Sequence, residues 1–466
     1  MGRPRVLVVG LDCLAPEFAF ERYKDRMPNL HALMARGAWG RLRSVMPPIT
    51  VPAWACMTSG RDPGELGVYG FRDRVRGRYD LSLVDSRSIR AKRIWHHLAD
   101  TGRTSSVLFV PPSFPPDTSP HVTSVGCFLT PDAESAWAHP AELKRELEAL
   151  FGPYLVDVHD VRNDDKHSVL RDLTRMTRQH FAMARHVWTT RDPDFLMMVE
   201  IGSDRLHHAM WNAMDPTHPR ATHDDSLVEG ARAYYALLDE ELGAFVKLVD
   251  DDTTVMVASD HGARTMLGGV CINEWLIANG WLTLKEAPTS VTPLRPSMVD
   301  WSRTRAWGEG GYYARIFLNV RGREPEGVIE SNEVERAKAD LRNQLAAMKG
   351  PTGAPLHNMI TDPVTAYRAA NGFPPDLAVC FNNLAYRSIG SVGHGRIFVD
   401  DNDQGEDGCN HDWNGVFAMA GRGVARLGEL DNLSLFDVTP TVLALFDIAA
   451  DAALLGHNLL TRTTST

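Results

Sequence analysis

The chain of 466 residues lacks the features of a membrane protein and of a nucleic-acid-binding protein. No apolar run reaches the length of about 18 residues that a membrane-spanning helix needs. Lys and Arg number 49 against 59 acidic residues, which gives a formal net charge of -10, and the basic residues form no block. Binding to a membrane or along a nucleic-acid polymer is therefore disfavoured, although a bound metal could still attract an anion.

The cysteines lack the C-x-x-C spacing of a metal-binding or redox motif, and their scatter favours reduced thiols over a disulfide framework. They are Cys13, Cys56, Cys127, Cys271, Cys380 and Cys409. The first residues lead directly into the apolar segment 6–10, which is shorter than the apolar region of a signal peptide and is followed by no cleavage site. We therefore expect a cytoplasmic protein.

Buried strands and helices alternate along much of the chain, which predicts an α/β fold with a mostly parallel central sheet flanked by helices. The strands are expected at 5–9, 105–110, 195–200, 253–258 and 415–421, and the helices at 27–37, 89–100, 140–150, 166–188, 227–249 and 437–446. Residues 266–365 differ, because they are rich in Trp, Gly and Pro and contain one clear helix, at 332–348. We expect a lid there, inserted between core segments 1–265 and 366–466.

Carboxylate and imidazole side chains occur at the ends of several predicted core strands. They are Asp12, Asp204, His208, Asp260 and His261, while His411 stands just before another strand. In open α/β sheets the carboxyl edge of the strands is where ligands bind. Six such side chains suit two divalent transition metal ions better than one. Paired ions of this kind assist phosphoryl displacement.

Thr50 follows two prolines, and Pro52 favours a helix beginning beside it. A hydroxyl at a helix N-terminus lies where backbone N–H groups and the helix dipole attract phosphate, so Thr50 could be a nucleophile. The alternative is that Thr50 only caps the helix.

The motifs together resemble the alkaline phosphatase superfamily, and within it the type I phosphodiesterase/nucleotide pyrophosphatase group with its predicted phosphohydrolase/phosphomutase branch. The resemblance rests on Thr50-Val51-Pro52 followed by 58–63, on the Asp204-x-x-x-His208 spacing, on Asp260-His261-Gly262, and on His411 before an apolar strand. It extends over nearly the whole chain, including segments 319–327 and 436–441.

This resemblance implies an alkaline phosphatase-like core with two metal ions, zinc first and manganese as the alternative. One ion would be held by Asp204, His208 and His411, and the other by Asp12, Asp260, His261 and the Thr50 oxygen. Thr50 would form a covalent phosphothreonine while the enzyme hydrolyses a small phosphorylated substrate. Two departures, Ala53 in place of an asparagine and Leu66 in place of a histidine, leave the choice between monoester and diester open.

Several alternatives accompany this interpretation. A phosphomutase or phosphotransferase would use the same site with an alcohol as acceptor, and a non-catalytic binding protein could retain the fold. His394 competes with His411 as a ligand, and His207 is a neighbour of His208. Arg264, Arg315 and Arg323 could contact substrate phosphate or lie on the solvated surface. The sequence leaves the oligomeric state open.

Overall fold

The computed structural model describes residues 2–400 and 405–462, and the chain divides into two compact units. Unit 1 comprises Met1–Leu66, Val84–Ala263 and His411–Thr466, and unit 2 comprises Gly67–Leu83 and Arg264–Asn410. The boundaries at 263 and 410 fall within the short strands β10 (Gly262–Thr265) and β18 (Cys409–Asp412).

Unit 1 is built on a ten-stranded sheet, with strands in the order β20-β2-β19-β9-β1-β8-β5-β6-β7 and β21 paired with β2. Its strands are β1 (Arg5–Leu11), β2 (Ala38–Arg43), β5 (Ser105–Leu108), β6 (Val122–Val125), β7 (Ala138–His139), β8 (Phe195–Glu200), β9 (Thr253–Ala258), β19 (Asn414–Gly421), β20 (Gly428–Glu429) and β21 (Leu433–Ser434). The run β9-β1-β8-β5-β6 is parallel, and β19 is antiparallel to both β9 and β2.

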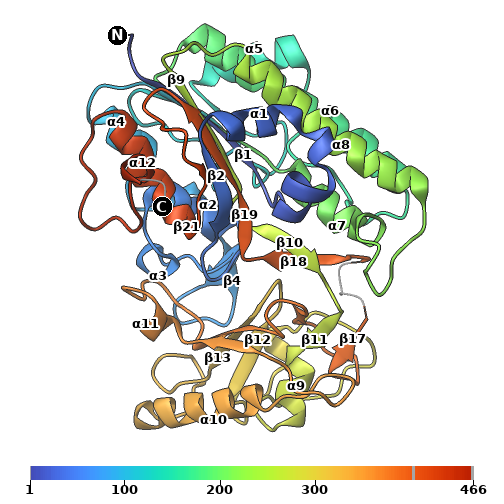
Figure 1. The fold of residues 1–466 in the computed structure, drawn as a ribbon. Helices are drawn as coiled ribbons and strands as arrows, with labels where there is room; N and C mark the ends of the chain where they lie inside the picture. Colours follow the sequence, from blue (N-terminus) through green and yellow to red (C-terminus); the bar gives the residue numbers. More distant parts are fainter. Residues whose placement is uncertain (1, 401–404, 463–466) are drawn as a thin grey trace. The chain divides into compact units, whose positions relative to one another are not determined.

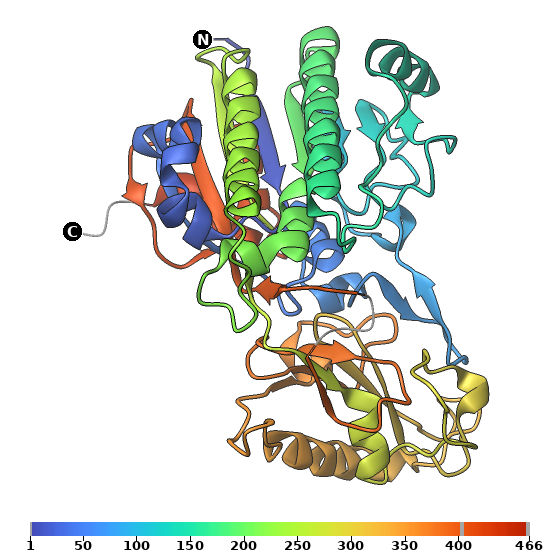
Figure 2. The same cartoon turned by 90° about the vertical axis from the view of Figure 1, so that its right-hand side faces the viewer.

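Helices cover both faces of this sheet (Figures 1 and 2), with α1, α6, α7 and α8 on one face and α2, α4 and α12 on the other. Their bounds are α1 (Pro28–Arg36), α2 (Thr50–Ser59), α3 (Pro63–Leu66), α4 (Ile94–Ala99), α5 (Ala141–Phe151), α6 (Lys166–Arg191), α7 (Gly202–Met214), α8 (Asp225–Val246) and α12 (Val438–Leu445). Because both faces are covered, β1, β8 and β9 are buried almost throughout, which explains their continuous apolar runs. The predicted α/β fold class is confirmed.

Unit 2 has a core of its own beside a four-stranded antiparallel sheet in the order β12-β13-β15-β14. A three-stranded sheet β16-β11-β17 and the hairpin β3–β4 complete its strands. The bounds are β3 (Arg72–Arg74), β4 (Leu81–Leu83), β11 (Gly269–Cys271), α9 (Ile272–Ala278), β12 (Ala306–Glu309), β13 (Ala314–Leu318), α10 (Val334–Ala346), β14 (Met359–Thr361), α11 (Pro363–Ala366), β15 (Leu377–Cys380), β16 (Arg387–Ile389) and β17 (Phe398–Val399).

The expected lid at 266–365 lies wholly within unit 2, which also takes in residues 67–83 and continues to 410. That this unit acts as a lid stays a prediction. All six cysteines are buried thiols outside any disulfide bond. In the described parts of the chain, every helix is too short or too polar for a bilayer crossing.

Candidate active site

Three neighbouring parallel strands of unit 1 bring three aspartates to one edge of the sheet. β1 pairs with β8 through Leu11↔Glu200 and with β9 through Gly10↔Ala258, so the three strands end at the same level. Asp12 follows β1, Asp204 lies in the first turn of α7 after β8, and Asp260 follows β9. All three side chains are buried.

Thr50 enters the site from α2, of which it is the first residue, and its side chain is buried. The cap position is occupied by Ile49, and no side-chain hydrogen bond caps this helix. The Thr50 Oγ1 atom instead lies 3.3 Å from His261 Nε2. The capping alternative for Thr50 therefore does not describe the local geometry.

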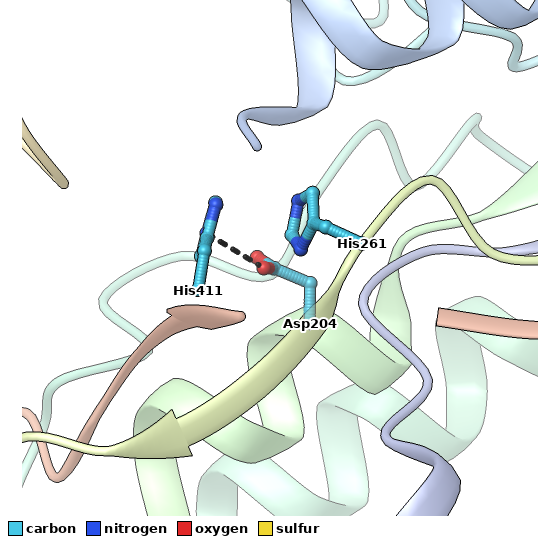
Figure 3. A group of neighbouring side chains, drawn as sticks. All are labelled: Asp204, His261 and His411. Atoms are coloured by element: carbon cyan, nitrogen blue, oxygen red, sulfur yellow. Dashed lines mark ion pairs between the residues drawn. The ribbon is translucent and has the colours of Figure 1, made fainter. Parts of the chain in front are cut away.

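The histidines complete the cluster (Figure 3), in which Asp204 from α7, His261 after β9 and His411 from β18 point toward one another. The rings of His261 and His411 stack with centroids 3.8 Å apart. Asp204 Oδ1 lies 3.4 Å from His208 Nε2 and 3.5 Å from His411 Nε2, and those two nitrogens are 3.4 Å apart. The second group is formed by Asp12, Asp260 and His261, with His261 Nε2 3.1 Å from Asp260 Oδ2 and 3.7 Å from Asp12 Oδ1.

Each aspartate has one oxygen held by the protein and one left without a hydrogen bond. Asp12 Oδ2 accepts from Trp54 Nε1 at 2.7 Å, Asp204 Oδ2 from Arg205 Nη1 at 2.8 Å, and Asp260 Oδ1 from the Cys13 N–H at 3.2 Å. The other three oxygens, Asp12 Oδ1, Asp204 Oδ1 and Asp260 Oδ2, are the only buried carboxylate oxygens without a hydrogen-bond partner in residues 2–400 and 405–462. Buried anionic oxygens are expensive unless a cation or donor meets them.

The tautomers of two histidines leave Nε2 lone pairs facing these carboxylates. His411 Nδ1 lies 2.8 Å from the Pro48 carbonyl oxygen, and His261 Nδ1 lies 3.1 Å from the Gly262 carbonyl oxygen. A carbonyl oxygen only accepts, so Nδ1 carries the proton in both neutral rings. Such Nδ1–H···O=C bonds orient metal-binding histidines, and a lone pair that faces a carboxylate oxygen needs a metal ion or a proton between the two atoms.

The electrostatics of the cluster favour the binding of cations. Burial, followed by the charge of Asp204, raises the pKa of Asp12 well above its usual value, and burial with the charge of Asp12 does the same to the pKa of Asp260. Burial opposes ionisation of Asp204 too, but His208, His411 and Arg205 hold its pKa well below the usual value. Burial also lowers the pKa values of His261 and His411, so these rings are neutral. The donor set and its charge therefore fit two divalent ions.

Some predicted candidates lie elsewhere. His394 is in unit 2, where its Nε2 lies 2.9 Å from Ser391 Oγ. His207 contacts Tyr235, with Nε2 2.8 Å from the hydroxyl, and burial lowers its pKa to about 3. The structure thus brings His411 and His208 into the cluster, whereas His394 and His207 lie outside it.

The three arginines proposed for substrate binding all belong to unit 2, and each guanidinium is held there. Arg264 Nη1 donates to the Asn383 carbonyl at 2.6 Å, Arg315 donates to the Arg72 carbonyl, and Arg323 pairs with Asp376 at 2.7 Å and with Glu324 at 3.0 Å. Their contact with substrate stays a prediction.

Sequence reasoning missed the groups that orient the ligands. Arg205 binds Asp204 and is itself held by Asp157, with Nη2 2.7 Å from Oδ2. Trp54, which the sequence analysis did not single out, donates to Asp12. Arg205 could have been noticed because it follows Asp204 directly in the sequence, and Trp54 because it lies one helical turn after Thr50. Neither pattern distinguishes a residue that orients a ligand from one that only packs.

An α/β core that gathers carboxylates, imidazoles and a buried threonine hydroxyl at one sheet edge defines a phosphoester hydrolase class. The family model for type I phosphodiesterase/nucleotide pyrophosphatase matches residues 6–393, and the chain belongs to this family. It is accordingly a phosphoric ester hydrolase. No curated protein sequence matches the chain.

Solved structures share the fold at low identity. Phosphonoacetate hydrolase from Sinorhizobium meliloti 1021, in complex with phosphonoformate, is 16% identical with a TM-score of 0.62, over 95% of this chain and 96% of that one. Human ectonucleotide pyrophosphatase/phosphodiesterase 5 is 12% identical with a TM-score of 0.56, over 97% and 96%. The murine protein in complex with AMP is 12% identical with a TM-score of 0.55, over 98% and 97%.

Proposed function

We propose that the protein is a two-metal phosphoester hydrolase that works through a covalent phosphothreonine at Thr50. The observation that carries this proposal is the position of Thr50 Oγ1, which lies at the start of a buried helix and 3.3 Å from His261 Nε2, within the cluster that contains three unpartnered carboxylate oxygens. A helix start also presents N–H groups and a positive dipole end to a phosphoryl group.

Asp204, His208 and His411 would hold one ion, and Asp12, Asp260, His261 and Thr50 the other, with zinc favoured and manganese as the alternative. Bound ions would lower the pKa of the Thr50 hydroxyl and neutralise charge on the phosphoryl oxygens. The role of Arg205, the Cys13 N–H and the Pro48 and Gly262 carbonyls is to fix which ligand atom faces inward.

The chemistry at Thr50 proceeds in two displacements. The hydroxyl releases its proton to solvent, and Oγ1 attacks phosphorus in line, so that the Thr50 oxygen–phosphorus bond forms while the bond to the leaving oxygen breaks. The leaving alkoxide takes a proton from water. A second water then attacks phosphorus, and the bond to Thr50 breaks while a proton from solvent returns to Oγ1. The product is phosphate from a monoester or a phosphate monoester from a diester. An alcohol in place of that water would give the mutase or phosphotransferase reaction.

The substrate would be a small molecule with a phosphoryl group. Solved relatives of this fold hold phosphonoformate and AMP, and both are small and carry one phosphorus group. Ala53 lies on the Thr50 helix where related diesterases carry an asparagine, so it offers no amide to a non-bridging oxygen. We therefore include both monoesters and diesters in the substrate range. We also propose that the enzyme is cytoplasmic.

The test compares Thr50→Ala with Thr58→Ala, which removes another buried threonine hydroxyl of the same helix. We expect Thr50→Ala to keep two ions per chain by elemental analysis and to lose more than about a hundredfold in turnover of p-nitrophenyl phosphate and bis-p-nitrophenyl phosphate. Thr58→Ala should keep most activity. Acid-quenched wild type should carry phosphate on Thr50 by mass spectrometry. Wild-type turnover in Thr50→Ala would reject the nucleophile.

A further inference from the structure

Trp54 connects the helix that carries Thr50 to a carboxylate of the second proposed metal site. It lies one turn after Thr50 in α2, and its side chain is fully buried. Its Nε1–H donates to Asp12 Oδ2 at 2.7 Å. Because neither group contacts solvent, no water can replace this hydrogen bond when it is lost.

Packing fixes the orientation of the indole independently of this hydrogen bond. Trp54 belongs to the core cluster between the sheet and α2. A Cβ atom on Gly10 would lie 2.6 Å from Trp54 Cη2, so the absence of a side chain at Gly10 in β1 makes room for the ring. The ring is thus held against the strand that ends beside Asp12, with its N–H directed at Asp12.

The three aspartates are oriented by donors of different strength. Asp204 meets the Arg205 guanidinium and Asp260 a backbone N–H, whereas Asp12 meets a neutral indole. A neutral donor fixes the rotamer of Asp12 but leaves the carboxylate charge uncompensated. Asp12 Oδ1 is then available, at 3.7 Å from His261 Nε2, as an anionic ligand.

We propose that Trp54 is a positioning residue for the metal ion held by Asp12, Asp260 and His261. It fixes Asp12 with Oδ1 toward that ion, and it ties the position of the ion to the helix that carries Thr50. This inference rests on the proposed function, since it assumes that the site holds two ions. Groups that hydrogen-bond to metal ligands commonly account for 10- to 100-fold in metal affinity.

The experiment replaces Trp54 by Phe, which keeps a large ring and removes the N–H. Trp95→Phe is the matched control, because Trp95 is also buried in unit 1 and donates from Nε1 to Asp117 Oδ2 at 2.8 Å. A third variant carries 3-benzothienylalanine at position 54, which has the shape of tryptophan with sulfur in place of N–H. The metal-free proteins are titrated with Co²⁺, and binding is followed by visible absorption and calorimetry.

We expect Trp54→Phe and the benzothienyl variant to weaken one of two Co²⁺ ions by about 10- to 100-fold and to leave the other unchanged. Excess metal should restore most turnover. The Trp95→Phe control should bind both ions like wild type. Unchanged affinity in the benzothienyl variant, or an equal loss in Trp95→Phe, would overturn the inference. If wild type itself binds fewer than two ions, the proposed function fails instead.

Discussion

The two units treat buried charge in opposite ways. In unit 2 several buried carboxylates meet a cationic side chain, as in the pairs Arg74–Glu324 at 2.7 Å, Lys338–Asp362 at 2.9 Å and Arg387–Asp407 at 3.3 Å. In the unit 1 site three carboxylates converge, each with one oxygen that accepts no hydrogen bond, and burial lowers the pKa values of His261 and His411 beside them. Unit 2 pairs these buried charges within its own fold, whereas in unit 1 the proposed metal ions would balance the charge of the site.

Local rules of folding are commonly broken at functional sites. In this protein the convergence of buried carboxylates locates the site more sharply than any single sequence motif does. Paired charges buried in a protein add little net stability, but the loss of one partner is costly. Asp12 and Asp260, whose pKa values are raised by burial and by neighbouring carboxylates, cost stability as they stand. The two units should therefore respond in opposite directions when charges or metals are removed.

The largest effect is expected from metal removal. Chelation followed by dialysis should reduce turnover by at least about a hundredfold and lower the melting temperature, because an ion present at a thousand times its Kd stabilises the folded state by about 4 kcal/mol. Activity and melting temperature should return together when Zn²⁺ or Mn²⁺ is added. A chelated protein with unchanged melting temperature and activity would contradict the contrast between the units.

Next in size is the loss of a paired charge in unit 2. Glu324→Gln leaves Arg74 buried without its counter-charge and also weakens the contact with Arg323, so we expect a loss of about 3–5 kcal/mol in urea unfolding. Glu330→Gln is the control, since it pairs with Arg321 at the exposed surface and should cost less than about 1 kcal/mol. Both variants should still bind two ions. Equal losses of unfolding free energy in the two variants would mean that the burial of an ion pair does not determine how much its loss destabilises the protein.

The opposite result is expected from Asp260→Asn in metal-free protein. The pKa of Asp260 is raised by burial and by Asp12, so above its ordinary value of 3.8 the unfolded chain releases the proton first and the folded state loses stability as the pH rises. Asparagine removes this loss and can still accept from the Cys13 N–H. We expect a gain of about 0.5–2 kcal/mol at neutral pH that shrinks toward pH 4, measured by urea unfolding, with activity abolished.

Asp239→Asn is the matched control for that change. Asp239 is also buried in unit 1 and has a raised pKa, but it accepts from Asn29 N, Leu30 N and Asn29 Nδ2 at 2.8–2.9 Å. Its replacement should destabilise the protein, because satisfied acceptors are lost. A gain in unfolding free energy in both variants would show that any buried aspartate in this unit lowers stability. The aspartates of the site would then not differ from other buried aspartates.

Sequence patterns predicted the parts of unit 1 that depend on continuous burial. β8 and β9 occupy the predicted residues, since strands covered on both faces are apolar throughout and end in polar ligands. The sequence analysis did not predict β2 or β6. β2 alternates arginine with apolar residues, and β6 is only four residues long and contains two hydroxyl side chains. The candidate ligands could be chosen because strand ends share one edge of the sheet.

The extent of unit 2 could not be predicted in the same way. Residues 67–83 join it through contacts distant in the chain, such as Tyr79 stacked on Trp301 with centroids 3.5 Å apart. No local periodicity signals such a contact. The role of Trp54 was hidden for a related reason, because a tryptophan that packs and one that also orients a ligand have the same sequence environment.

The smallest expected effect concerns Arg323, which tests whether charges in unit 2 serve only the fold. Its guanidinium is already paired with Asp376 and Glu324, and about a third of the side chain is exposed, at 35%. Only the exposed part of the guanidinium can meet a substrate. Arg323→Ala should therefore raise KM for the p-nitrophenyl ester of thymidine 5′-phosphate by no more than about two- to fivefold, the scale of a partly exposed ion contact. KM for p-nitrophenyl phosphate should change less, since that ester is too small to reach beyond the metal ligands. Arg321→Ala, at a more exposed neighbour paired with Glu330, is the control and should leave both values unchanged. Equal changes for both esters in Arg323→Ala would assign this arginine to the fold alone and make the contrast between the two units complete.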